Sequence, residues 1–453
     1  MPGGTKPIPI AITIAGSDSG GGAGIEADLK TFTALGVYGV VALTSVTAQN
    51  TREVTAIHDI PPDIVYKQIE AVAEDIGIDA GKTGMLSNKE IIEAVARAVG
   101  RYRFPLVVDP VMVAKSGARL LKEDAVEALV DKLLPLARVV TPNKLEAEVL
   151  AGFEIKSLED ARKAARKISV ETGVEAVVVK GGHLEGDESV DILYWRGDFR
   201  EYRAPRIREG CTHGGGCGYS AAIAAGLAKG LSIPESVELA KKFITVAIDY
   251  GLKIGGGYCP INPAAWIEIP AEKYWAIVDV EEAVEIVVAN ASVIKPLVPE
   301  VGMNIARIIA PRYARSTSDV IAVAGRIVRY GDTIKPIGPV KPGASSHLAR
   351  AILEAVKYNP SVRAAVNIAH DKGFIERAIR KGYRVVYVDR SREPPDIKAR
   401  EGASIPWIIR EAFRISEKPD IIYDTGDIGK EAMARILGES AVEVVRKILD
   451  ILS

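Results

Sequence analysis

Residues 212–218 read Thr-His-Gly-Gly-Gly-Cys-Gly and run directly into Tyr219-Ser-Ala-Ala-Ile-Ala-Ala-Gly-Leu-Ala228. The alanine-rich part favours a helix, so the glycines are predicted to form a loop that opens into a helix N-terminus. At such a terminus the first backbone N–H groups lack intrahelical partners and the helix dipole is positive. This arrangement is suited to anions, phosphate above all. The alternative is a flexible turn that carries a buried structural cysteine.

Cys217 lies at the mouth of the predicted helix. A helix N-terminus lowers the pKa of a neighbouring thiol and favours the thiolate. We therefore expect Cys217 to have a lowered pKa and to be a chemically active group beside the anion site.

The chain upstream of this loop alternates short apolar strands with amphipathic helices. Strands are predicted at 8–15, 37–48, 106–109 and 176–180, helices at 24–35, 62–76 and 87–99, and a strand that gives way to a helix at 139–146. This repeated alternation predicts an α/β fold with a mainly parallel sheet and helices on both faces. Such sheets bind ligands beyond the carboxyl ends of their strands. Asp109, Asn143, Glu146 and Lys180 all follow strands, so we expect them to meet the 212–218 loop in one crevice.

A glycine- and proline-rich stretch at 255–263 interrupts the pattern and predicts a domain boundary near 265–275. A second, smaller α/β domain is expected beyond it, which gives domains at 1–268 and 269–453. Its predicted strands are 320–324, 327–330, 364–368 and 384–388, and its predicted helices are 280–291, 345–358, 429–437 and 440–452.

The composition of the 453 residues is that of a globular protein with a net charge of −1. No apolar run is long enough to span a membrane, and no secretory signal opens the chain. Neither a membrane nor a nucleic acid is therefore expected as a partner, and the cytoplasm is the expected location. The chain holds only two Gln, a scarcity of thermolabile amides that fits a thermophile. Its three Cys form no Cys-x-x-Cys pair and its five His are scattered, so neither a disulfide framework nor a structural zinc site is expected.

Seven blocks in the first half occur in a characteristic order. They are Ala15-Gly-Ser-Asp-Ser-Gly-Gly-Gly-Ala-Gly-Ile-Glu-Ala-Asp-Leu-Lys30, Thr47-Ala-Gln-Asn-Thr51, Lys82-Thr-Gly-Met-Leu86, Val107-Val-Asp-Pro-Val-Met-Val113, Thr141-Pro-Asn-Lys-Leu-Glu-Ala-Glu148, Val179-Lys-Gly-Gly-His183 and the 212–221 loop. This half resembles the hydroxymethylpyrimidine (phosphate) kinases of thiamin biosynthesis, within the ribokinase-like superfamily. The rival is a vitamin kinase for pyridoxal-type substrates, against which Gln49 and the 15–30 block argue.

The resemblance implies a role for each matching residue. Asp28 and Gln49 would hydrogen-bond the aminopyrimidine, and Met85 and Val111 would form apolar walls against its ring. Cys217 would activate the substrate hydroxyl as a base. Mg²⁺ would be organised by Asp109 and Glu146. ATP and its phosphates would be held by Asn143, Lys180, Thr212, Gly214, Gly215 and Gly216. The plainer alternatives are a turn residue for Gln49, a core filler for Met85 and an ordinary first-turn residue for Glu146.

The phosphate loop departs from the family pattern. Thr-His-Gly-Thr-Gly-Cys-Thr is usual there, whereas this chain has Gly215 and Gly218 in place of the two inner threonines. The backbone amides survive this change, but two hydroxyl contacts do not.

The second half resembles the archaeal-type thiamin-phosphate synthase domain. The matching stretches are Val298-Pro-Glu-Val-Gly-Met-Asn-Ile305, Val323-Ala-Gly-Arg-Ile327, Pro339-Val-Lys-Pro-Gly-Ala-Ser-Ser-His347, Arg363-Ala-Ala-Val-Asn-Ile368 and Pro419-Asp-Ile-Ile-Tyr-Asp-Thr-Gly-Asp-Ile-Gly-Lys430. The implied reaction joins hydroxymethylpyrimidine diphosphate to a thiazole phosphate and releases pyrophosphate. Arg326 would neutralise the departing pyrophosphate, and His347 would contact or protonate it. Weaker candidates for Mg²⁺ and phosphate binding are Asp424, Asp427 and Lys430.

Two alternatives stay open for the second half. Arg326 and His347 are otherwise an ordinary surface arginine and a helix-surface histidine, and the domain could bind thiamin phosphate as a sensor without catalysis. For the whole chain the expected cofactors are ATP and Mg²⁺. The expected partners are small molecules (the aminopyrimidine alcohol or its phosphate, thiazole phosphate and ATP) and further copies of the chain.

Overall fold

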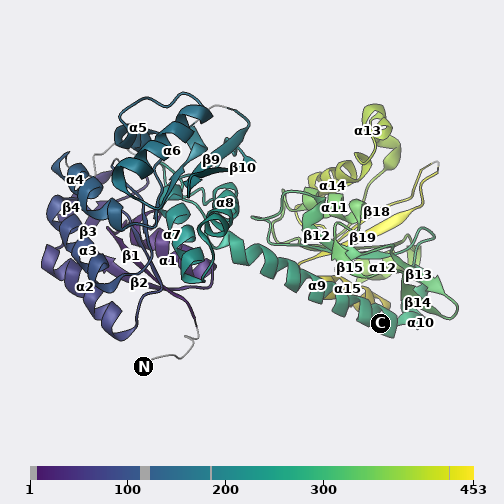
Figure 1. Cartoon of the computed structure of the whole chain (residues 1–453). Coiled ribbons are helices and arrows are strands. Elements are labelled where there is room, and N and C mark those ends of the chain that lie inside the picture. Colours follow the sequence, from purple (N-terminus) through teal and green to yellow (C-terminus); the bar gives the residue numbers. More distant parts are fainter. Residues whose placement is uncertain (1–7, 113–122, 184–185, 428) are drawn as a thin grey trace. The chain divides into compact units, whose positions relative to one another are not determined.

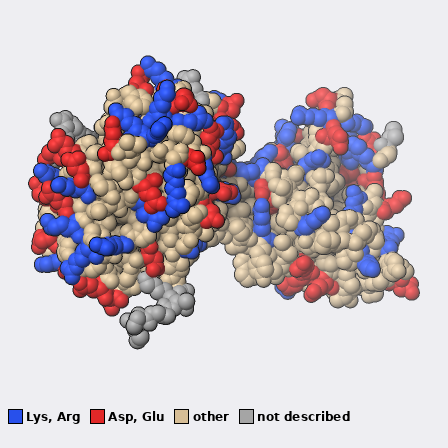
Figure 2. Space-filling model, in the orientation of Figure 1, with Lys and Arg blue, Asp and Glu red and all other residues tan. Residues whose placement is uncertain are grey.

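The structure is a computed structural model that describes residues 8–112, 123–183, 186–427 and 429–453 (Figure 1). It separates into two compact units, Met1–Ile267 and Glu268–Ser453. The helix α9 (Ala265–Ala289) contains the boundary. In Figure 2, basic and acidic side chains are interspersed over the visible face of the molecule, as the near-zero net charge suggests. Within the described residues, no helix has both the length and the apolar character needed to cross a membrane.

The first unit is built on an eight-stranded sheet with the order β10-β9-β8-β7-β6-β5-β1-β2. Strands β2, β1, β5, β6, β7 and β8 run parallel, whereas β9 and β10 are antiparallel additions at one edge. The strands are β1 (Ile10–Ala15), β2 (Tyr38–Leu43), β5 (Ala80–Thr83), β6 (Leu106–Val108), β7 (Val139–Val140), β8 (Ala176–Val179), β9 (Glu188–Trp195) and β10 (Asp198–Pro205), and a separate hairpin is formed by β3 (Ser45–Gln49) and β4 (Val54–Asp59).

Helices cover both faces of this sheet. Their bounds are α1 (Gly24–Ala34), α2 (Pro62–Asp75), α3 (Lys89–Tyr102), α4 (Glu123–Ala128), α5 (Lys144–Ala151), α6 (Leu158–Thr172), α7 (Gly215–Ala228) and α8 (Ile233–Asp249). One buried cluster joins α2, α3 and α6 to the sheet, and a second joins α1, α7 and α8 to it. Successive residues of β1 point to opposite faces of the sheet, so Ile12 belongs to the first cluster and Ala11 to the second. The predicted parallel sheet with helices on both faces is thereby confirmed.

The second unit holds a seven-stranded, mostly antiparallel sheet with the order β15-β12-β11-β16-β19-β18-β17. Its strands are β11 (Asn304–Ile308), β12 (Val320–Val323), β15 (Val340–Pro342), β16 (Ala364–Ala369), β17 (Val385–Tyr387), β18 (Ile421–Asp424) and β19 (Met433–Gly438), with a hairpin of β13 (Ile327–Tyr330) and β14 (Thr333–Pro336). The remaining helices are α10 (Ala291–Ile294), α11 (Ser346–Ala355), α12 (Lys372–Arg380), α13 (Pro395–Ala399), α14 (Ser404–Ile415) and α15 (Ala441–Leu452). Helices α11 and α14 pack on one face.

One predicted element of this unit is wrong. The helix expected at 429–437 is instead the strand β19, whose six residues are all buried. Ala434, Arg435 and Leu437 favour helices as isolated residues. Hydrogen bonding to β16 on one side and β18 on the other outweighs that local preference.

Candidate active sites

The carboxyl ends of the parallel strands in the first unit bring the phosphate loop to a buried ion pair. Lys180 follows β8 and its Nζ lies 3.0 Å from Oδ1 of Asp109, which follows β6. Gly216 lies against this pair, because a Cβ there would be 3.4 Å from both Asp109 Oδ2 and Lys180 Nζ. Burial alone would lower the pKa of Lys180, but the charges of Asp109 and Glu146 outweigh burial and raise it. Lys180 is therefore a permanent positive charge beside the loop.

The loop itself is fixed by close backbone packing. Gly214 is the N-cap of α7 with φ +77°, and a Cβ there would lie 1.8 Å from the carbonyl oxygen of Gly22. Gly218 packs against Ile261, whose Cδ1 would be 2.7 Å from an added Cβ. Gly215 has open space around it. Backbone packing thus requires glycine at 214, a side chain at 218 would have to displace the end of the Ile261 side chain, and a side chain at 215 would meet nothing.

A second anchor of the loop is His213, which sequence reasoning did not select. Its Nε2 lies 3.0 Å from Oδ2 of Asp18, and the same carboxylate accepts hydrogen bonds from the backbone of Gly20, Gly22 and Ala23. Burial alone would raise the pKa of Asp18, but the hydrogen bonds from His213 and the backbone lower it. The turn at 18–23 and the phosphate loop are therefore held together by one carboxylate. The exposed Thr212 contributes its carbonyl oxygen, which accepts from the N–H of Gly215 at 3.1 Å.

The predicted lowering of the Cys217 pKa is wrong. Burial raises the pKa of this thiol to about 11, although the charge of Lys82 and a backbone hydrogen bond from Gly24 act in the opposite direction. The negative charges of Asp28 and Asp109 add to the effect of burial. The helix dipole is therefore outweighed, and Cys217 is a neutral thiol at pH 7.

Asp28 belongs to a buried ion pair. It is wholly buried and its two carboxylate oxygens accept hydrogen bonds from Lys82, at 2.8 and 3.0 Å, and from Thr13 at 2.6 Å. The predicted contact between Asp28 and the pyrimidine does not fit this geometry. Lys82, which sequence reasoning did not select, is equally buried; burial would lower its pKa, but the charge of Asp28 raises it.

The other predicted pyrimidine contacts are half-buried residues around the same strand ends. Gln49 ends β3 at an irregularity in the hairpin, and its main chain exchanges hydrogen bonds with the hydroxyl of Ser19. Met85 follows β5, and a Cβ on Gly16 would lie 2.5 Å from the Met85 methyl group. The N–H of Val111 donates to the carbonyl of Asp109 at 2.8 Å. All three side chains are partly accessible to a ligand.

Asn143 and Glu146 form a capping box at the start of α5. The Asn143 side chain accepts from the N–H of Glu146 at 3.0 Å, and Glu146 Oε2 accepts from the N–H of Asn143 at 2.7 Å. Burial raises the pKa of Glu146 to about 7; Lys180 opposes this rise and Asp109 adds to it. Asp109, Glu146 and Lys180 thus form one electrostatic group. Across the part of the chain that the structure describes, no set of three or more His, Cys, Asp or Glu side chains could hold a metal ion by itself.

Contrary to expectation, Cys211 and Cys259 form a disulfide. The partners lie 48 residues apart, so no local spacing reveals the pairing. The bond joins the residue that precedes the phosphate loop to the glycine-rich segment at 255–260. That segment donates hydrogen bonds from Gly257 and Tyr258 to Thr51, at the tip of the β3–β4 hairpin. The disulfide therefore links the phosphate loop to the hairpin that carries Gln49.

The candidate site of the second unit lies at one end of its sheet. Arg326 follows β12 with φ +85°, is exposed, and donates to the carbonyl of Val301. His347 lies in the first turn of α11, where its Nε2 is 3.3 Å from Nε of Arg435. Burial, followed by the charges of Arg435, Arg326, Arg390 and Arg350, lowers the pKa of His347 to about 3. His347 is therefore neutral, and its predicted role in protonating the leaving group does not fit this state.

The weaker candidates of this unit are engaged in ion pairs and hydrogen bonds. Asp424 is fully buried, and its Oδ2 accepts from Arg435 at 2.9 Å while Arg390 lies 3.8 Å from Oδ1. Asp427 pairs with Lys398, and Lys430 donates to Ser404 at 3.2 Å. Asp424 is thus the counter-ion of two arginines rather than a free metal ligand.

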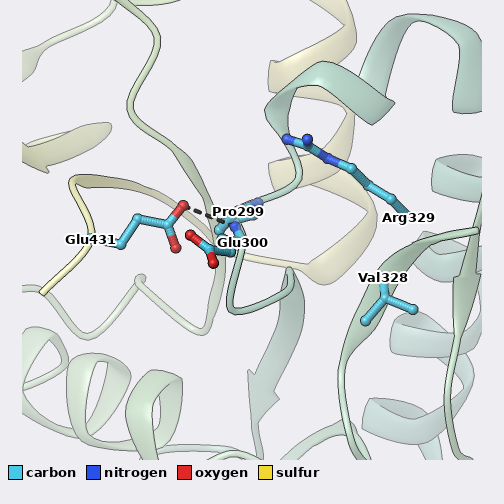
Figure 3. Close-up of a pocket in the computed structure, with 5 residues that line it drawn as sticks. All are labelled: Pro299, Glu300, Val328, Arg329 and Glu431. Carbon is cyan, nitrogen blue, oxygen red and sulfur yellow. Dashed lines mark hydrogen bonds between the residues drawn. The ribbon is translucent and has the colours of Figure 1, made fainter. Parts of the chain in front are cut away.

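A cavity of about 530 Å³ lies beside the segment that holds Arg326 (Figure 3). Its lining residues are Pro299, Glu300, Val328, Arg329 and Glu431. Glu431 accepts from the backbone N–H groups of Glu300 at 2.9 Å and Val301 at 3.3 Å. Since Val301 also accepts from Arg326, the cavity and Arg326 share one loop.

Comparisons with known proteins assign both halves of the chain. Residues 18–262 match the family described as phosphomethylpyrimidine kinase, and residues 279–450 match the family described as thiamine-phosphate synthase ThiN. The hydroxymethylpyrimidine/phosphomethylpyrimidine kinase of Rhizobium meliloti is 50% identical over 255 residues, which cover 56% of this chain and 96% of that protein. The thiamine biosynthesis bifunctional protein ThiED of Geobacter sulfurreducens is 50% identical over 252 residues, 55% of this chain and 51% of that protein.

Solved structures resemble the first half. A pyridoxal kinase from Bacillus subtilis in an ADP complex is 40% identical with a TM-score of 0.54, and the match covers 57% of this chain and 98% of that one. A pyridoxal kinase from Staphylococcus aureus with AMP-PCP and pyridoxal is 38% identical with a TM-score of 0.53, covering 57% and 95%. The predicted resemblances of both halves and the ribokinase-like fold are thereby confirmed.

Proposed function

Because the chain belongs to the phosphomethylpyrimidine kinase family and carries a ThiN thiamine-phosphate synthase domain, we propose that it performs two consecutive steps of thiamin biosynthesis. The kinase, assigned to 1–268, phosphorylates hydroxymethylpyrimidine and then its monophosphate with ATP. The synthase, assigned to 269–453, joins the diphosphate to thiazole phosphate. The observation that carries the kinase half is the Lys180–Asp109 pair, which lies against the first turn of α7.

Phosphoryl transfer depends on positioning and charge neutralisation. Lys180 and the backbone amides at the start of α7 would hold the phosphoryl group as the substrate hydroxyl attacks phosphorus and the bond to ADP breaks. The hydroxyl proton needs an acceptor. Cys217 can accept it only through its thiolate fraction, which is small at neutral pH because the thiol pKa is about 11. A base role for Cys217 therefore requires turnover to increase with pH.

The residues present fit a magnesium ion that arrives with ATP. Asp109 lies beside the phosphate loop and interacts electrostatically with Glu146. Mg²⁺ prefers one or two carboxylates completed by water and phosphate oxygens, so two carboxylates suffice. When bound, the ion would supply positive charge to the phosphate oxygens. Lys180 meanwhile holds Asp109 in place, and Asn143 holds Glu146 through the capping box.

In the synthase reaction a carbon–nitrogen bond forms between the pyrimidine methylene and the thiazole ring, and the carbon–oxygen bond to pyrophosphate breaks. The electron pair leaves on pyrophosphate, so charge accumulates at that end of the substrate. Arg326 is exposed on the same sheet end as His347 and offers a guanidinium to this charge.

The decisive experiment supplies the full chain with hydroxymethylpyrimidine, ATP, Mg²⁺ and thiazole phosphate and follows the products by mass spectrometry. Thiamin phosphate is expected from the unmodified protein. Arg326→Ala is expected to accumulate the pyrimidine diphosphate instead. Accumulation of the diphosphate by the unmodified protein would favour a sensor role for the second unit.

A second candidate activity for the first unit is pyridoxal phosphorylation. Pyridoxal kinases of 38–40% identity share its fold. The curated pyrimidine kinase of Rhizobium meliloti is more similar, at 50% identity. Parallel assays with hydroxymethylpyrimidine and pyridoxal at equal concentrations decide between them, and we expect a higher kcat/KM for the pyrimidine.

We further propose that the protein works in the cytoplasm, where ATP is supplied, as an assembly of identical chains. Disulfides are rare in the cytoplasm of mesophiles but frequent in intracellular proteins of hyperthermophiles. The Cys211–Cys259 bond and the scarcity of Gln both fit the second group. Light scattering on the full chain measures the number of copies.

A further inference from the structure

The positive charges of four arginines from different parts of the second unit act on His347. Arg435 comes from β19, Arg350 from α11 itself, Arg326 from the turn after β12, and Arg390 from a short helical turn, Arg390–Arg392, after β17. The acidic groups that face these arginines are Asp424 on β18 and Glu393, which pairs with Arg390 at 3.2 Å. Four positively charged guanidinium groups are thus balanced by only two carboxylates. This excess of positive charge around a neutral imidazole is suited to a polyanion.

Arg435 is held rigidly behind the imidazole. Arg435 is only 1% exposed. Its strand β19 is hydrogen-bonded on both sides, and Arg435 is in register with Asn367 of β16 and Ile422 of β18. Its Nη1 donates to Asp424 Oδ2 at 2.9 Å and its Nε faces His347 Nε2 at 3.3 Å. An arginine side chain has donors only and is not deprotonated in proteins. The ring nitrogen that faces it must therefore supply a lone pair.

We propose that Arg435 is a positioning residue, which fixes His347 as the Nδ1–H tautomer so that this N–H donates a hydrogen bond to the diphosphate group of the synthase substrate. Asp424 takes part by holding Arg435. The ligand class is a diphosphate ester or pyrophosphate itself. The inference rests on the proposed synthase function, because it concerns the anion that the reaction releases.

Within the part of the chain that the structure describes, Arg390, another of the arginines whose charge acts on His347, has an unpartnered buried donor, as its partner Glu393 has an unpartnered acceptor Oε1. Nε of Arg390 is buried and, among the described residues, has no hydrogen-bond partner. The residue is only 6% exposed, so desolvation of this N–H is uncompensated in the free protein. A phosphate oxygen near His347 would supply the acceptor. No proton transfer from His347 is needed, because the electron pair of the broken carbon–oxygen bond stays on pyrophosphate while the Nδ1–H hydrogen bond stabilises its charge.

The test is nitrogen-15 NMR of the histidine side chains in the full chain, with His347 assigned by the loss of its signals in His347→Asn. The unmodified protein is expected to show His347 as the Nδ1–H tautomer at all values from pH 5 to 8. Inorganic pyrophosphate is expected to shift the Nδ1–H proton resonance. An Nε2–H tautomer, an imidazolium at pH 7, or a resonance unmoved by saturating pyrophosphate would each overturn the proposal.

Variants separate positioning from simple structural support. Arg435→Met alone leaves Asp424 buried and unpaired, so the double variant Arg435→Met/Asp424→Asn removes both charges of the pair. In it we expect a mixture of tautomers, a His347 pKa at least about one unit higher, and a synthase kcat reduced by about tenfold or more. Arg350→Met is the control, since it removes a nearby charge but leaves the Arg435 hydrogen bond, and it should keep the Nδ1–H tautomer. A single retained tautomer in the folded double variant would contradict the role of Arg435.

These readouts also separate the inference from the proposed function. The tautomer and its response to pyrophosphate are measured without turnover. Correct NMR behaviour in a chain that forms no thiamin phosphate would reject the synthase function alone, whereas synthase activity with the wrong tautomer would reject this inference alone.

Discussion

The thiol of Cys217 interacts electrostatically with two lysines, Lys82 and Lys180, and with two buried carboxylates, and its protonation decides what it can do. If its thiolate is the base, kcat/KM of the kinase should increase with pH between 6 and 9, towards the thiol pKa of about 11. Cys217→Ala should lower turnover by roughly 10²–10⁴-fold and flatten the profile. A steady-state pH series on both proteins measures this. A flat profile in the unmodified protein, with near-normal turnover in the variant, would limit Cys217 to holding the substrate.

Glu146 should make the stability of the first unit depend on pH. Its pKa rises from an ordinary 4.5 to about 7 on folding, so the folded state favours the protonated form. The stabilisation from this group is fully present below pH 4.5 and is lost as pH rises through 7. Relative to Glu146→Gln, the unmodified protein should lose up to about 3 kcal/mol of unfolding free energy across that window. Calorimetry at several pH values measures it, with Glu159→Gln as an exposed control. Parallel pH dependence in all three proteins would contradict this assignment.

Single residues were predictable where a strand end fixed their position. Asp109 and Lys180 follow buried strands, and the structure brings them together at 3.0 Å. The pairing of Asp28 with Lys82 was not predictable, because the motif gives the presence of Asp28 but not the direction in which α1 turns it. Arg435 and His213 were not predicted as site residues, because the residues they contact, His347 and Asp18, are distant in the sequence. No local pattern marks such pairs.

At the scale of elements, the loop before α7 should tolerate change at one glycine and not at its neighbour. Gly214→Ala would place a Cβ 1.8 Å from the carbonyl oxygen of Gly22 in a left-handed conformation. It should destabilise the first unit by about 1–3 kcal/mol or more and reduce kinase turnover. Gly215→Ala is the matched control, because nothing lies within 4 Å of its Cβ. Thermal unfolding and kinase assays on both variants measure the contrast, and equal melting temperatures would refute the packing argument.

The covalent link between the phosphate loop and the 255–260 segment should be a measurable source of stability. Reduction of the Cys211–Cys259 bond should lower the unfolding free energy of the first unit by about 2–4 kcal/mol. The Cys211→Ser variant should reproduce that loss and become insensitive to reductant. Cys217→Ser should keep the full response, since Cys217 is the free cysteine. Unfolding curves with and without dithiothreitol decide this, and a reductant effect that persists in Cys211→Ser would contradict it.

Elements were predictable where the hydrophobic period and the capping residues agree. The helix α5 has a capping box, and other local signals are as clear: α7 is rich in alanine, and the buried strands β6 and β8 are continuous apolar runs. The strand β19 does not, since Ala434, Arg435 and Leu437 favour a helix until neighbouring strands pair with them. Gly218, which the sequence left unexplained, packs against the end of the Ile261 side chain.

At the scale of the whole molecule, each described site draws its residues from one unit. Lys180, Asp109 and Glu146 belong to the first unit, and Arg326 and His347 belong to the second. Two inactive full-length variants, Lys180→Met and Arg326→Ala, should therefore restore thiamin phosphate formation when mixed. Free pyrimidine diphosphate should accumulate first, followed by product after a lag. Mass spectrometry over time measures both. A mixture that makes the diphosphate but no product would indicate that the intermediate must pass within one chain.

The two-part organisation was predictable because the glycine and proline cluster at 255–263 interrupts the strand–helix pattern. The long helix α9 immediately after it was not fully anticipated, since only its second half was predicted. Pairing of Cys211 with Cys259 was also missed, because bond formation depends on the meeting of two loops that the sequence separates by 48 residues.

The left-handed backbone of Arg326 has a consequence for protein engineering. An ordinary residue in this conformation costs about 1–2 kcal/mol, and glycine largely avoids that cost. A search for thermostabilising substitutions would therefore select Arg326→Gly among its first choices, although on the proposed function this variant would lose the guanidinium that meets the pyrophosphate charge. If Arg326 has the proposed role, the substitution that best relieves its backbone strain also lowers synthase activity.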